Sequence, residues 1–153
     1  MSNRGGVLVV DESSNVQSIL AAVDKEFRLK ALQDAIKSAS QIVIKDAKSR
    51  CPKGQQRTGK KSGKKHLRDT ITRVFRDYGN VKMDVVGPAY PAGAHGHLVE
   101  YGHEEVVFGK RTGRRVPPKP FMRPAVDATK QAQHSAIVRV LTERASAAES
   151  QAK

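Results

Sequence analysis

The strongest constraint on the fold of this chain is the segment Pro120-Phe121-Met122-Arg123-Pro124-Ala125. Pro120 has no backbone N–H to donate and suits a helix start, while Phe121 offers a large apolar anchor at that entrance. Apolar residues near one face of a helix follow it, namely Ala125, Ala128, Ala132, Ile137 and Leu141. The segment therefore predicts where a C-terminal helix joins the core.

A long helix is also predicted from about Lys25 to Arg50. Its apolar residues recur at helical spacing, and they are Phe27, Ala31, Leu32, Ala35, Ile36, Ala39, Ile42, Val43 and Ala47. Alternating polar and apolar residues between Thr70 and Gly87 then predict a β-hairpin that turns at 78–80. We expect the short apolar run 106–108 to pair with the same sheet.

These elements predict an α+β fold in a single domain, residues 1–153. The expected architecture is a small antiparallel β-sheet packed by a long N-terminal helix and a C-terminal helix, with long basic loops. Residues 1–24 would supply an edge strand at Val7–Val10 and a short helix. The short segment 98–102 would be ordered, and the Ala- and Ser-rich tail 145–153 would fray.

Charge is the second dominant feature, because 28 Lys and Arg residues face 15 Asp and Glu residues, for a net charge of +13. Much of it lies in a loop expected to be flexible, 53–66, and in a second basic loop, 109–115. The candidate docking or polyanion contacts are Lys53, Arg57, Lys60, Lys61, Lys64, Lys65, Lys110, Arg111, Arg114 and Arg115. Protein docking, incidental contact with a DNA backbone and plain solvation all remain open. Aromatic residues do not interleave these charges, so sequence-specific nucleic-acid recognition is disfavoured.

No pattern indicates catalysis, and we expect no enzymatic activity, bound metal or cofactor. Residues 54–61 nearly match the phosphate-binding loop motif, but Lys61 stands where Ser or Thr should bind magnesium. The segment also follows a predicted helix, whereas a phosphate-binding loop follows a strand. The cluster His95, His97 and His103 with two nearby glutamates is expected to be solvated or interfacial rather than a zinc site. The single cysteine, Cys51, is expected to be a small semi-buried residue, since it follows a helix and precedes a proline. We also expect no signal peptide and no membrane span.

Four motifs, taken in order, resemble the tail-completion or head-tail joining proteins of long-tailed bacteriophages. In that family a helix ends at a Pro, and a Thr-Gly precedes a Leu-Arg-Asp-Ser-Ile-like run. A Val-Glu-Phe-Gly-Thr-like signature and a Pro-Phe-Leu-x-Pro-Ala-like helix start then follow. The structural positions carried over from these motifs are Gly59, Leu67, Glu100, Tyr101, Gly102, Pro120, Phe121 and Pro124.

The same resemblance suggests roles for two of these residues. Glu100 would pair with an Arg or accept backbone donors at a turn, and a plain exposed Glu in a turn remains the open alternative. Gly102 would adopt a backbone angle closed to other residues. Two departures are evident, because residues 60–66 intervene between the Thr-Gly and Leu67, and His103 stands where a Thr is common. The loop is therefore longer and more basic than in the family.

The resemblance implies a structural virion protein at the head-proximal end of a phage tail, assembled in the host bacterial cytoplasm. Its implied partners are copies of itself in a hexameric ring, tail tube or terminator proteins, and neck or connector proteins. Non-specific contact with packaged DNA is left open. The alternative within the same class is a tail terminator or neck stopper. The alternative from another class is a general DNA-binding protein.

Overall fold

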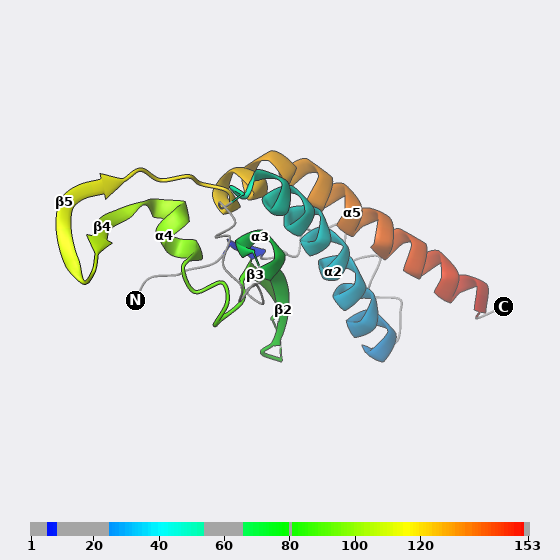
Figure 1. Ribbon diagram of the computed structural model, residues 1–153. Helices are drawn as coiled ribbons and strands as arrows, with labels where there is room; N and C mark the ends of the chain where they lie inside the picture. Colours follow the sequence, from blue (N-terminus) through cyan, green and yellow to red (C-terminus); the bar gives the residue numbers. More distant parts are fainter. Residues whose placement is uncertain (1–5, 9–24, 54–65, 80, 152–153) are drawn as a thin grey trace.

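The computed structural model describes residues 6–8, 25–53, 66–79 and 81–151, and it has the predicted α+β class. Two long helices, α2 (Lys25–Arg50) and α5 (Met122–Gln151), pack along one another (Figure 1). The remaining elements are β1 (Gly6–Leu8), α3 (Leu67–Thr70), β2 (Ile71–Asp77), β3 (Lys82–Pro88), α4 (Gly96–Tyr101), β4 (His103–Val107) and β5 (Lys110–Val116).

Helix α2 has the bounds that its apolar spacing predicted. It ends before Cys51-Pro52, because a proline disfavours the helical conformation of the residue before it. Its buried face consists largely of small residues, Ala31, Ala35, Ala39 and Ala47. Small side chains let α5 approach α2 closely. The two helices are therefore in contact from the core cluster around Ala47 and Ala125 to the second cluster around Ala31 and Leu141.

The predicted hairpin is present as β2 and β3, which pair antiparallel from Ile71 with Pro88 to Asp77 with Lys82. Strand β1 adds antiparallel to the other side of β3, so the order is β1-β3-β2 and β1 is an edge strand, as expected. Helix α2 packs against β2 and β3. One face of this sheet therefore lies against the helices.

Phe121 stands at the centre of the larger core cluster and is fully buried. It is grouped there with Val43, Ala47 and Cys51 from α2 and its end, Ile71 and Val86 from the sheet, and Ala125 from α5. The prediction of a core anchor at the entrance to α5 is thus confirmed. A second cluster joins Ala31 and Ala35 to Leu141 farther along the two helices.

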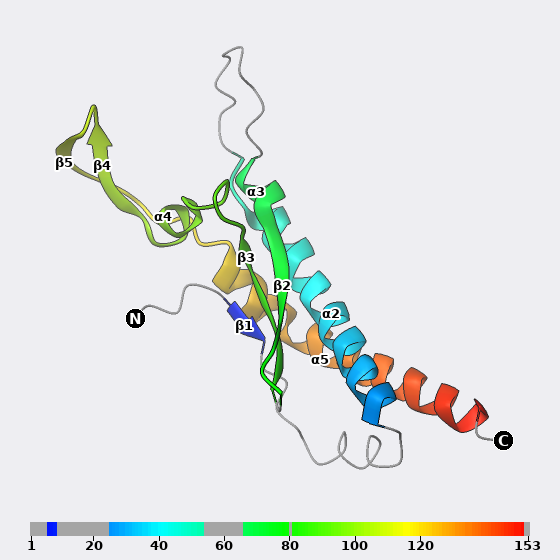
Figure 2. The same ribbon diagram turned by 90° about the horizontal axis from the view of Figure 1, so that it is seen from below.

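The prediction for residues 103–116 is wrong in two respects. The run 106–108 does not pair with the main sheet, and the expected basic loop 109–115 is largely a strand. Strands β4 and β5 pair with each other in a separate two-stranded sheet. Figures 1 and 2 show this hairpin at the opposite end of the molecule from the C-terminal end of α5. Residues 103–116 are called the hairpin arm below.

The short segment near 98–102 is ordered, as expected, and most of it belongs to helix α4. The remaining expectations differ from the structure or fall outside it. Helix α5 continues through the segment expected to fray, as far as Gln151. The predicted short helix near the N-terminus and residues 54–65 of the basic loop lie outside the described residues.

Candidate docking surfaces

Glu100 caps the N-terminus of α5 from the last turn of α4. Its carboxylate accepts hydrogen bonds from the backbone N–H groups of Phe121, Met122 and Arg123, at 2.8, 3.0 and 3.1 Å. A helix start leaves four N–H groups without intrahelical partners, and the fourth position here is Pro124, which has none. Glu100 is buried, and its charge is also favourable beside the positive end of the helix dipole. Of the two roles suggested for Glu100, accepting backbone donors is the one observed.

Two further contacts fix the base of the hairpin arm. The Lys119 N–H donates to the Val99 carbonyl at 2.8 Å, which ties the chain leaving the arm to α4. Gly102 ends α4 at φ 72° and ψ 166°, and a Cβ atom there would lie 2.6 Å from the Val116 carbonyl oxygen. Only glycine suits both the backbone angle and this close approach, as predicted. The arm is therefore held at its root by α4 and the start of α5.

The hairpin arm itself has no core. None of the residues in β4 or β5 is buried, and Val106, Val107 and Phe108 are exposed at its tip. Isolated two-stranded hairpins are at best marginally stable in water, because they bury little apolar surface. The arm thus presents apolar side chains that none of the described segments covers.

The turn at the tip joins Val107 to Lys110, which pair with each other, through Phe108 and Gly109. Both turn residues have positive φ, 49° and 78°, and this is the pattern of the tight turns that favour Asn-Gly in hairpins. A bulky residue such as phenylalanine is strained in that conformation. Phe108 is nevertheless there, fully exposed. Strain of this kind is found most often at sites of contact or function.

The predicted basic contacts are only partly described by the structure. Lys53 is exposed just after α2, whereas the candidates between 57 and 65, and Gly59, lie outside the described residues. Lys110, Arg111, Arg114 and Arg115 are exposed on β5, and Arg111 forms an ion pair with Glu104 at 3.2 Å. All four lie on β5, from Lys110 beside the apolar tip to Arg115 nearer the root of the arm.

The structure also describes three other positions carried over from the resemblance, one packed against the core and two exposed. Leu67 packs against the larger core cluster from α3. Tyr101 is exposed at the end of α4, beside the base of the arm. Pro120 is exposed and precedes the buried Phe121. Tyr101 follows Glu100 and Pro120 precedes Phe121, so both flank the capping contact between α4 and α5.

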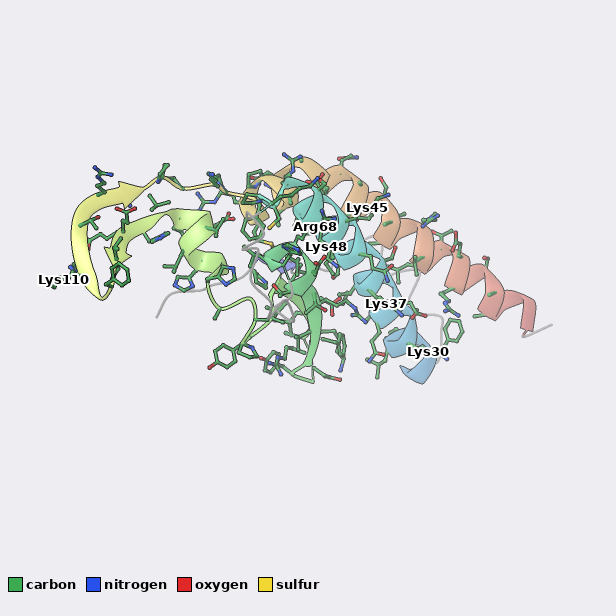
Figure 3. The ribbon with its side chains drawn as sticks, viewed as in Figure 1. Lys30, Lys37, Lys45, Lys48, Arg68 and Lys110 are labelled. Atoms are coloured by element: carbon green, nitrogen blue, oxygen red, sulfur yellow. The ribbon has the colours of Figure 1, made fainter. Side chains whose placement is uncertain are left out.

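Sequence reasoning missed a second charged surface, on α2. Figure 3 shows Lys30, Lys37, Lys45 and Lys48 following this helix along its length. The first three side chains are exposed and Lys48 is half-buried. The spacing of these lysines could have indicated a single face, although the lysine-rich loop dominates the charge pattern of the sequence. Arg68, from the adjoining α3, is also labelled there.

A buried ion pair was missed as well. Asp84 on β3 is completely buried, and both of its oxygens accept from Nη1 of Arg73 on β2, at 2.9 and 2.8 Å. Arg73 remains partly exposed. Such a pair fixes how β2 and β3 meet, since either charge alone would be costly to bury.

The histidine cluster is not assembled as a site. Glu100 is occupied by α5, while Nδ1 of His97 lies 2.8 Å from the Ala94 carbonyl oxygen. Among the described residues, no group of three or more His, Cys, Asp or Glu side chains could hold a metal ion. Cys51 is buried in the core, and burial raises the pKa of its thiol. Among the helices that the structure describes, none combines the length and the hydropathy of a membrane span.

Comparison with known proteins gives one family. The model of the family described as "Bacteriophage HK97-gp10, putative tail-component" matches residues 16–102, more than half of the chain. The match ends at Gly102, so it includes Glu100 and the root of the hairpin arm but not the arm itself. No curated protein matches, and no solved structure matches.

Proposed function

Because the chain belongs to the HK97-gp10-like family of phage tail components, and is thus part of the virion, we propose that it completes the head-proximal end of the tail and joins it to the head. It does so as a homo-oligomeric ring around the DNA channel, assembled in the host cytoplasm. Six copies would match the symmetry of the tail. The protein acts by geometry and not by catalysis.

The observation that carries this proposal is the hairpin arm. Its apolar tip is exposed, its strands have no core, and its root is fixed by Glu100 and Gly102. An anchored arm of this kind suits a subunit that is completed by a neighbouring protein in an assembly. The basic residues behind the tip would steer the arm toward an acidic tail or neck surface.

The proposal is tested with a phage whose copy of this gene carries an early stop codon, by electron microscopy of the lysate. Filled heads beside unjoined tails of normal length are the expected result. Abnormally long tails would instead assign the protein as a tail terminator, and tails with emptied heads would point to a neck stopper. Intact, infectious virions would contradict the joining role and favour the general DNA-binding alternative.

A further inference from the structure

The exposed face of α2 carries a row of lysine side chains. Lys30, Lys37, Lys45 and Lys48 recur at spacings close to whole helical turns, so they form one row along the helix. We call these four residues the lysine stripe. At 1.5 Å per residue the stripe is about 27 Å long, which is the length of about eight base pairs of duplex DNA.

Within the described part of the chain, the charges of the stripe are not neutralised by acidic side chains. Among the residues that the structure describes, none of the four lysines forms an ion pair or hydrogen bond with another side chain. The nearby acidic residues Asp34 and Asp46 are already paired, with Arg144 and with Arg50 respectively. The stripe is therefore available to an external polyanion.

The composition of this face indicates which polyanion. The exposed large apolar residues of the described chain all lie outside α2, and the stripe is accompanied by polar residues such as Gln33 and Gln41. Protein interfaces have apolar cores and are depleted in lysine. A row of flexible ammonium groups without exposed large apolar neighbours suits a hydrated phosphate backbone and carries no means of reading bases.

We propose that the lysine stripe of α2 binds the phosphate backbone of double-stranded DNA without sequence preference. This deepens the proposed function, since it rests on a ring through which DNA passes and names the surface that contacts it. Lysines act as point charges that do not lock a phosphate in one geometry, so DNA can shift along them. The hairpin arm and the stripe would then serve different partners, protein and DNA.

The test measures binding of the isolated protein to a mixed-sequence duplex, by fluorescence anisotropy, as salt is raised. The slope of log K against log salt is negative. Replacing all four lysines with Gln should reduce its magnitude by about 3 to 4, because each phosphate that is no longer neutralised removes roughly 0.9. The pair Lys37→Gln and Lys45→Gln should reduce the magnitude by about 2. Replacing the same four lysines with Arg should leave the slope unchanged.

The matched control removes charge from the other long helix. Lys130→Gln with Arg139→Gln takes two exposed cations from α5 and should leave the slope close to that of the unsubstituted protein. The proposal would be overturned if this control reduced the magnitude of the salt slope as much as the Lys37 and Lys45 pair does. It would also be overturned if the protein bound polyglutamate as tightly as DNA. Because the assay needs no phage, its failure is distinct from a failure of the joining experiment, which is scored on virions.

Discussion

At the scale of single residues, Glu100 decides how two parts of the molecule meet. It is one side chain from α4, yet it satisfies all the backbone donors at the start of α5 that lack helical partners. Pro124 removes the need for a fourth acceptor. The direction in which the hairpin arm leaves the body is thereby tied to the axis of the longest helix.

Substituting Glu100→Ala should destabilise the protein by about 2 to 4 kcal/mol, because three N–H groups lose a charged acceptor in a buried setting. Glu100→Gln should cost less, since it retains one oxygen. Chemical denaturation measures both. Glu104→Ala is the control, because its exposed pair with Arg111 should contribute about 1 kcal/mol or less. Equal losses of stability for Glu100→Ala and Glu104→Ala would contradict a capping role.

Cys51 gives a prediction about pH. Burial raises the pKa of its thiol above the unfolded value, so the unfolded chain ionises first as pH rises. The free energy of unfolding should therefore fall as pH rises above about 8.5, the ordinary thiol pKa. Cys51→Ala should show a smaller fall over the same range. Parallel curves for the two proteins in urea titrations would rule this contribution out.

At the scale of elements, the hairpin arm combines a strained turn with an exposed apolar tip. Asparagine adopts positive φ more readily than phenylalanine. Phe108→Asn should therefore keep or improve the turn while it removes the apolar side chain from the tip. We expect the unfolding free energy to change by no more than about 0.5 kcal/mol, and complementation of the stop-codon phage to fall at least about tenfold, as expected for an aromatic anchor of an interface.

Tyr90 supplies the control for that experiment, since it is also a highly exposed aromatic residue, on another loop. Tyr90→Ser should leave complementation near the wild-type titre. Full complementation by Phe108→Asn would show that the tip does not dock, and the arm would then have to act through its basic residues alone.

At the scale of the whole molecule, Phe121 links the two long helices and the main sheet. Its cluster includes residues from α2, α5, β2 and β3. Phe121→Ala should therefore cost about 3 to 5 kcal/mol and lower the protection of amide hydrogens in α2 and β3 together. Phe27→Ala, at a half-buried site near the start of α2, should cost less. A thermal midpoint unchanged by Phe121→Ala would contradict its central place in the core.

The sequence by itself determined the two long helices, the β2–β3 hairpin and the anchor at Phe121. In each case the signal is local, because periodic apolar residues mark the buried face of α2 and the Pro-Phe start marks the entrance to α5. Along α5 itself the apolar pattern is a weaker guide, since Ala128 and Ala132 are exposed. The family resemblance likewise rests on short motifs in a fixed order. A single domain, and the roles assigned to residues 57–65, remain predictions.

Tertiary structure alone decided the hairpin arm, the partners of Glu100 and the lysine stripe. Strand β5 has no alternation of polar and apolar residues, since neither of its faces is buried, so only its pairing with β4 defines it. The three donors to Glu100 lie 21 to 23 residues away in sequence. The stripe became a distinct surface only because α5 and the sheet cover the other sides of α2. The partners of Glu100 and the exposure of the stripe depend on contacts between distant segments, which local sequence patterns do not encode. The pairing of β4 with β5 is local, but it leaves no apolar period in the sequence because neither face is buried.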